Sequence, residues 1–177
     1  MSPRFAPPDR VSANAQQPDR GARVDGGTGS RSSGPPQAVT RRTVIVDTNV
    51  AVAGLLTARA TSPVARILDG MLGAAFPFAL SEALLAEYRA VLARPELRKQ
   101  HGLAVAEIDS ILTGVALHAI VLKPLTAARA PDPGEQLLWD LLATRSDLVL
   151  VTGDKPLLRD AAMERRVISA RMFIDGT

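Results

Sequence analysis

Two aspartates follow short apolar runs of the chain, in positions where carboxylates can form a reactive site. Asp47 comes directly after residues 43–46, and Asp154 lies two residues beyond residues 148–152. Apolar and β-branched runs of this length are typical of strands buried on both faces of a parallel sheet. Ligands bind beyond the carboxyl ends of such strands, so we expect both aspartates at one rim of the sheet. Taken alone, each could serve only as a turn or helix-capping residue.

Two glutamates are expected to reach the same rim from helices. Glu87 borders the apolar stripe of an expected helix over residues 82–93. Glu82 lies in the first turn of that helix, where an acid interacts favourably with the helix dipole. This interaction explains Glu82 without a role in the site. Glu135 begins a later helix, at the end that faces the loops of the strand ends. Asp132 is the competing acid in that segment and also a candidate N-cap.

Carboxylates gathered at one rim indicate a metal site. Four of them would repel one another strongly unless a cation were present. Oxygen-rich sites of this kind suit Mg²⁺ or Mn²⁺, and Mg²⁺ keeps several of its waters when so bound. One or two such ions can polarise a phosphodiester, supply a hydroxide and stabilise the departing oxygen. The pattern therefore indicates hydrolytic phosphoryl chemistry.

The elements that must position these acids alternate between strands and helices. Ser62-Pro63 and Ser81 are helix-start signals, and Arg94-Pro95 is expected to end a helix. Alternation of this kind implies a parallel sheet with helices on both faces. The predicted fold is a three-layer α/β/α domain with a central, mainly parallel sheet. Strands are expected at residues 43–46, 75–80, 119–122, 148–152 and 167–168, and helices at 50–56, 63–72, 82–93, 105–117, 135–145, from 156 onward and after Ser169.

The first 42 residues differ in composition from the rest of the 177-residue chain. They contain 6 Pro, 5 Gly and 5 Ser, with seven Arg against three Asp. Such a segment cannot bury enough apolar surface to offset its ordering entropy, so we expect a disordered tail over residues 1–42 and one domain over residues 43–177. The domain carries 14 basic and 15 acidic side chains. The basic balance of the whole chain therefore comes from the tail, and the net charge of the domain does not support a basic surface for nucleic acid.

Composition also excludes several functional classes. The chain has no Cys, which excludes disulfides, thiolate metal sites and a cysteine nucleophile. No apolar run reaches the ~18 residues of a membrane span, and the N-terminus lacks the apolar stretch of a secretory signal. The expected location is therefore the cytoplasm, with no membrane contact.

Four motifs in this order resemble the PIN-domain family. They are Val-Asp47-Thr48-Asn49-Val, Leu80-Ser81-Glu82 with Glu87-Tyr88 after it, Gly134-Glu135, and Val151-Thr152-Gly153-Asp154. The likeness covers about residues 43–175 and is closest to the branch of toxin components related to VapC-type toxins. It implies a metal-dependent endoribonuclease that leaves 5′-phosphate and 3′-hydroxyl ends.

The resemblance assigns roles to individual residues of this chain. The family's acids map to Asp47, Glu87, Glu135 and Asp154, and we expect Asp47, Glu135 and Asp154 to bind the metal. Glu87 would complete the site or orient the attacking water. Supporting roles fall to two neighbouring polar residues, Asn49 and Thr152.

The chain departs from the family pattern at two positions. Many members take their third acid from an Asp-rich run, whereas here it is Glu135, which leaves Asp132 as an alternative metal ligand. Many also carry another acid two residues past the last aspartate, where this chain has Pro156. Metal binding at that corner is therefore expected to be weaker or to depend on fewer side chains.

The expected partners are an RNA substrate, a cognate antitoxin protein and a second or further copy of the chain. Exposed cations could steer RNA, although each could equally belong to an ordinary solvated surface: Arg59, Arg94, Arg98, Lys99 and Lys155. With one Trp, one Tyr and four Phe, base stacking on aromatic side chains is not expected to dominate RNA binding. The alternative function is a non-catalytic module of the same fold that acts by binding a protein or RNA partner.

Overall fold

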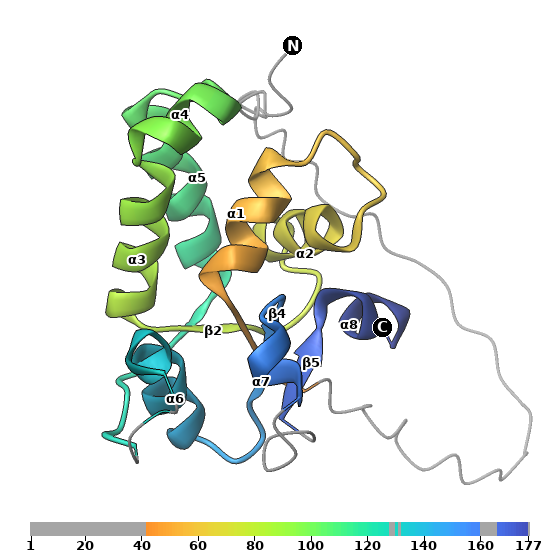
Figure 1. Ribbon diagram of the computed structural model, residues 1–177, viewed down its shortest axis with the longest axis vertical. Helices are drawn as coiled ribbons and strands as arrows, with labels where there is room; N and C mark the ends of the chain where they lie inside the picture. The colour runs from red at the N-terminus through yellow and green to blue at the C-terminus, as the bar shows by residue number, and fades with distance from the viewer. Residues whose placement is uncertain (1–41, 128–129, 131, 160–165, 177) are drawn as a thin grey trace, which may run out of the picture. The chain divides into compact units, whose positions relative to one another are not determined.

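The computed structural model describes residues 42–127, 130, 132–159 and 166–176 (Figure 1). The predicted tail, apart from Arg42, lies outside the described residues. Within the described part of the chain, none of the helices has the length and apolar character needed to cross a membrane.

Helices and short strands alternate along the domain, as the sequence pattern predicts. Ser62, Ser81 and Ser169 begin helices by accepting a hydrogen bond from the backbone N–H three residues further on, which satisfies a donor that the helix itself leaves free. The strands are β1 (Val44–Val46), β2 (Ala79–Leu80), β3 (Ile120–Val121), β4 (Val149–Thr152) and β5 (Val167–Ser169). The helices are α1 (Thr48–Leu56), α2 (Pro63–Leu72), α3 (Glu82–Leu92), α4 (Pro95–His101), α5 (Val105–His118), η1 (Pro133–Glu135, a 3₁₀ turn), α6 (Gln136–Ala143), α7 (Lys155–Arg159) and α8 (Ala170–Asp175).

All strand pairs in the described residues are parallel. β4 lies between β1 and β5, and β2 pairs with β3. A bridge between Val44 and Phe78, with a hydrogen bond from the Val44 N–H to the Pro77 carbonyl, joins β1 to the chain entering β2. The spatial order is therefore β3, β2, β1, β4, β5, and the direction of chain progression reverses at β1 and β4. This mixed α/β arrangement with a mainly parallel sheet confirms the predicted fold class.

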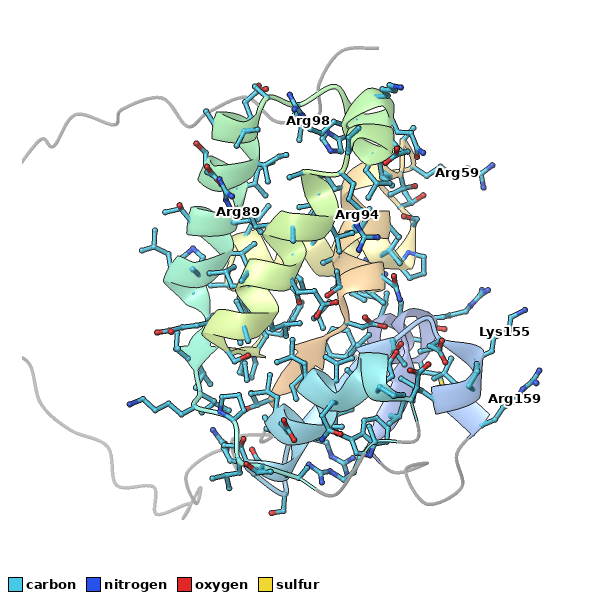
Figure 2. All side chains as sticks on the ribbon, turned by 60° about the vertical axis from the view of Figure 1, so that its left-hand side comes forward. Arg59, Arg89, Arg94, Arg98, Lys155 and Arg159 are labelled. Carbon is cyan, nitrogen blue, oxygen red and sulfur yellow. The ribbon has the colours of Figure 1, made fainter. Side chains whose placement is uncertain are left out.

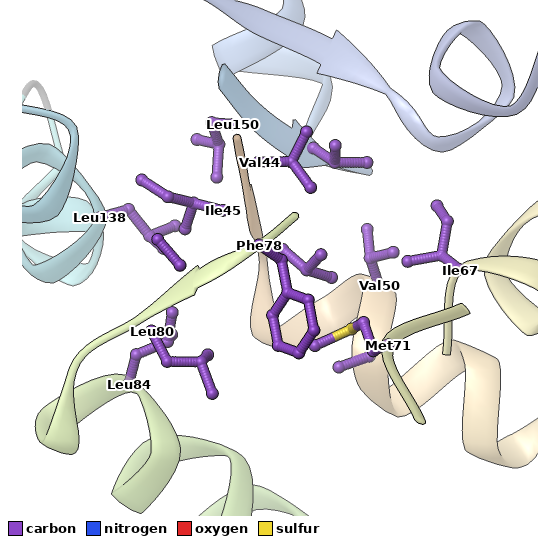
Figure 3. Close-up of a cluster of buried hydrophobic side chains, with 14 of the residues drawn as sticks. Val44, Ile45, Val50, Ile67, Met71, Phe78, Leu80, Leu84, Leu138 and Leu150 are labelled. Atoms are coloured by element: carbon purple, nitrogen blue, oxygen red, sulfur yellow. The ribbon is translucent and has the colours of Figure 1, made fainter. Parts of the chain in front are cut away.

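Apolar side chains cover both faces of the central strands. Figure 3 shows Ile45 of β1 beside Leu138 of α6, whereas the ring of Phe78 lies beside Met71 of α2. These side chains belong to one buried cluster. Because successive strand residues point to opposite faces, helices from both halves of the chain are needed to bury β1.

Helices α1 and α2 approach each other closely at a glycine. A Cβ atom at Gly54 would lie only 2.6 Å from the carbonyl oxygen of Val64 and 3.0 Å from the Cβ of Leu68. No side chain fits there without moving the backbone of α2. Gly54 therefore determines how closely α2 packs beside the helix that follows Asp47.

Several boundaries differ from the sequence-based expectation. Helix α1 begins two residues earlier than predicted, because Asp47 is its N-cap. The strand expected at 75–80 is shorter, as only Ala79 and Leu80 form β2. Helix α4 was not predicted: Pro95 ends the preceding helix but also occupies the first turn of a new one, where a missing N–H has no cost.

We expect Gly54→Ala to lower the free energy of unfolding by about 1–3 kcal/mol, the usual cost of overpacking a tight contact. Urea denaturation followed by circular dichroism would measure it. The matched control is Gly153→Ala, because a Cβ there meets nothing within 4 Å. Equal stability of the two variants would show that the α1–α2 contact is not tight.

Candidate carboxylate site

Asp47 is a buried carboxylate at the carboxyl end of β1. Only 4% of its surface is exposed. Its backbone N–H donates to the Val151 carbonyl across the β1–β4 pair, and its Oδ1 accepts from the backbone N–H of Asn49 at 3.2 Å. Buried carboxylates require such partners because an unpaired buried charge is costly. The chain around β1 and α1 therefore fixes both the position and the rotamer of Asp47.

Thr152 links the two aspartates of the rim. Its Oγ1 donates to Asp47 Oδ2 at 2.6 Å and accepts from the backbone N–H of Asp154 at 3.0 Å. The residue is completely buried, and the β1–β4 register brings the two strand ends together. One hydroxyl thus holds both the Asp47 side chain and the turn that carries Asp154.

Asp154 begins α7 from that turn. Its Oδ1 accepts from the Leu157 N–H at 3.0 Å, and it is half-buried. The capping role that the sequence suggests is therefore present. It occupies one carboxylate oxygen, which leaves lone pairs for a further partner.

Glu87 reaches the rim from α3, and its neighbour Tyr88 attaches that helix to β1. The hydroxyl of Tyr88 donates to the carbonyl of Val46, the residue before Asp47. Burial raises the pKa of Tyr88 well above its ordinary value, and the negative charges of Asp47 and Glu87 raise it further. Those electrostatic contributions indicate that Glu87 and Asp47 both lie near this tyrosine.

Glu135 is the acid most strongly affected by the others. Its pKa is raised to about 7, first by burial and then by the charges of Asp47, Asp154, Asp132 and Glu87. Since like charges disfavour ionisation only at short range, the other four acids lie close enough to Glu135 to raise its pKa. We call these five residues the carboxylate rim.

The two acids before α6 differ in their environment. Asp132 is exposed, and its Oδ1 accepts from the Gly134 N–H at 2.8 Å, so that it caps the 3₁₀ turn. Glu135 is half-buried, and its Oε2 has no hydrogen-bond partner among the described residues. A buried oxygen without a donor is uncommon and calls for an explanation. Of the two candidates, Glu135 has the environment of a ligand and Asp132 that of a cap.

The donor set of the rim suits a hard divalent cation. It consists of carboxylate oxygens, one of them unpartnered, and nearby Thr48 Oγ1 is also buried without a partner in the described residues. Within those residues, however, no three Asp, Glu or His side chains are grouped tightly enough to hold an ion directly. The acids are thus close enough to influence each other's protonation, while coordination of a shared ion would need water or side-chain rotation.

The predicted acids belong to the carboxylate rim, and the predicted supporting residues, Asn49 and Thr152, both contact Asp47. These two supporting residues act differently from what the motifs suggest. Asn49 contributes its backbone N–H to Asp47, while its side chain is exposed. Thr152 binds Asp47 as well as the Asp154 turn. Sequence reasoning missed the contact of Tyr88 with Val46, because Tyr88 entered it only as a neighbour of Glu87 in a motif and as a member of the apolar stripe of its helix. A tyrosine among aliphatic residues was the available signal, because a buried hydroxyl needs a partner.

We expect Thr152→Val to lower the free energy of unfolding by about 1–3 kcal/mol, since it leaves a buried carboxylate oxygen and a backbone N–H unpaired. Thr152→Ser, which keeps the hydroxyl, should recover most of the loss. Chemical denaturation of the three proteins measures this. If valine were tolerated as well as serine, the hydrogen bond would not hold Asp47.

The metal-free protein should lose stability as the pH rises from about 4.5 to about 7. The folded state favours protonated Glu135 because its pKa is raised, so the stabilisation is complete below the unfolded pKa and lost above the folded one. Thermal melts across this range, in the presence of a chelator, should show a drop that Glu135→Gln reduces. Glu96→Gln, at an exposed acid of α4, is the control, and an unchanged drop in Glu135→Gln would exclude Glu135 as its source.

The comparison with protein-family models is consistent with this geometry. Residues 43–156 match the model of the PIN domain, a segment that runs from the start of the sheet through the turn carrying Asp154. No curated protein sequence matches the chain with significance. The match covers more than half of the 177 residues, and the chain therefore belongs to the PIN-domain family.

Proposed function

We propose that this protein is a metal-dependent endoribonuclease that hydrolyses RNA at the carboxylate rim. PIN domains are generally nucleases and generally use a divalent metal ion. The observation that carries the proposal is Glu135, a half-buried acid whose pKa is raised to about 7 by burial and by four neighbouring carboxylates. A rim that keeps five acids together is unfavourable for folding, and a functional cation would account for it.

Asp47, Glu135 and Asp154 are the proposed metal ligands, with Asp132 as the alternative to Glu135. Carboxylate donors favour Mg²⁺ or Mn²⁺ over softer ions, and Mg²⁺ commonly binds partly through water. Such coordination agrees with acids that are near one another but not tightly grouped. When bound, the ion would polarise the phosphodiester and offset the charge of the departing oxygen.

The chain's own groups hold the reacting parts in place. Thr152 and the Asn49 N–H orient Asp47, as hydrogen bonds behind a ligand commonly do. Glu87 is the proposed acceptor that orients the attacking water. Its helix is fixed to β1 by the hydrogen bond from Tyr88 to the Val46 carbonyl, so Glu87 has little freedom to move away from the rim.

RNA would approach across exposed cations. In Figure 2, Lys155 and Arg159 project together from α7, and Arg59 points to the same side from the connection between α1 and α2. All three are exposed, and Lys155 is adjacent in sequence to Asp154. These cations can attract a phosphate backbone toward the acidic rim, which would otherwise repel it.

The first experiment is cleavage of a mixed pool of RNA by the purified protein, with Mg²⁺, with Mn²⁺ and with a chelator. We expect metal-dependent cleavage that Asp47→Asn reduces by at least about 10³-fold, since loss of a directly acting group usually costs that much or more.

The control is Glu96→Gln, which neutralises an exposed acid in the first turn of α4 and should cleave like the parent protein. Metal-dependent cleavage by Asp47→Asn at the parental rate would contradict the proposed site. A folded parent protein that binds RNA without cutting it would favour the non-catalytic binding module.

We further propose that the nuclease is the toxin of a toxin–antitoxin pair, as the resemblance of its motifs to VapC-type toxins suggests. The cognate antitoxin would be a small protein that covers the acidic rim. Expression of the chain should then arrest growth in a manner that depends on Asp47, and co-expression of the product of an adjacent small gene should relieve the arrest. Growth arrest that persists in Asp47→Asn would count against this role.

A further inference from the structure

An open groove of about 770 Å³ lies beside the carboxylate rim. One wall consists of residues of α1 and of the start of α2, including Val50, Ala53 and Val64. The other consists of α7 and the start of α8, including Leu158 and Ala170. The volume is within the range of pockets that hold small organic molecules.

The groove is continuous with the carboxylate rim. Asp154 and Thr152 line it, and the same two residues belong to the hydrogen-bonded link with Asp47. Asn49, whose backbone binds Asp47, also lines it with its exposed side chain. A molecule that binds with one end at the carboxylate rim would therefore extend into the groove.

The groove and its surroundings have the character of a nucleotide site. Its walls are mainly apolar, whereas Lys155 and Arg171 line it as exposed cations. Arg171 has only a loose ion pair with Asp175, 3.7 Å long and mostly exposed, which is worth little in water. Apolar walls suit the faces of a base, and the cations suit phosphates on either side of it.

We propose that this groove binds a nucleobase of the RNA strand, next to the phosphate at the carboxylate rim. The proposal rests on the proposed ribonuclease function and specifies where the substrate lies. Among the described residues, no aromatic side chain lines the groove, so the base is held by aliphatic packing and by polar contacts at its edge. An apolar peptide would fill the same walls but would gain nothing from the adjoining acids and cations.

The test uses short RNAs of one cleavable sequence in which a single nucleotide at a time is replaced by an abasic one. We expect the KM to rise about five- to tenfold at one position next to the cut, the lower end of the effect of losing one bound base. The kcat should change little, because the sugar-phosphate backbone at the rim is intact. An equal KM for all abasic RNAs would overturn the proposal.

Substitutions in the two walls of the groove test whether the base that contributes to KM binds there. Ala53→Phe and Ala170→Leu enlarge half-buried side chains that line the groove. Each should raise the KM of the unmodified RNA to that of the abasic one and should leave the abasic RNA unaffected. Ala90→Phe, on an exposed position of α3 outside the groove, is the matched control and should behave like the parent protein. If the abasic RNA still has a higher KM than the unmodified RNA in both groove variants, the base binds elsewhere.

A binding measurement separates this proposal from the catalytic one. The Kd of the uncleaved RNA is measured for Asp47→Asn, with and without Ala53→Phe. The groove proposal is supported if the double variant binds the intact RNA more weakly than Asp47→Asn does and binds the abasic RNA no more weakly than the intact one. This result would support it even if the parent protein cuts no RNA. An unchanged Kd overturns the groove proposal even if cleavage is found. Loss of binding to a protein partner, with RNA binding unaffected, would assign the groove to a protein instead.

Discussion

A carboxylate with 4% of its surface exposed must have its hydrogen bonds supplied by the protein, and for Asp47 they come from two directions. The Asn49 N–H is local, since it belongs to the first turn of α1, whereas the Thr152 hydroxyl comes from the end of β4. The second contact exists only if β1 and β4 pair in the correct register. The site around Asp47 is therefore complete only when the central strand pair has formed.

Repulsion among the acids is the opposing constraint. Five carboxylates share the rim, and the effect is clearest at Glu135, whose pKa is raised. Glu135 is half-buried, and one of its oxygens has no hydrogen-bond donor among the described residues. Apolar packing behind the rim must offset this unfavourable term. The buried cluster around β1, with Ile45 against α6 and Phe78 against α2, supplies it from both faces of the sheet (Figure 3). The core thus holds together groups that would separate if they were free.

Local signals in the sequence were sufficient for much of the fold but not for contacts between distant segments. Serine caps at 62, 81 and 169 predicted helix starts that the structure confirms, because capping depends on neighbours in the chain. Helix α4 carried its own signals, with Pro95 in the first turn, Lys99 in the last and Gly102 at a positive φ as its C-cap. It was overlooked because a proline that ends one helix can also begin the next. The double role of Thr152 depends on a pairing between segments 105 residues apart, which no local pattern reveals.

The place of the groove follows from the strand order. The chain moves from β1 toward β2 and β3 on one side, and only then to β4 and β5 on the other. The groove lies between the segments that follow these two strands, with α1 and the start of α2 on one wall and α7 and the start of α8 on the other. Asp154, in the turn after β4, lines this opening, and the Thr152 hydroxyl joins that turn to Asp47 at the end of β1. In a parallel sheet the reversal of strand order leaves a crevice at this point, and here the crevice has acids at one end and apolar walls at the other. A nucleotide of RNA, in which a sugar joins a phosphate to a base with flat apolar faces, matches both ends at once.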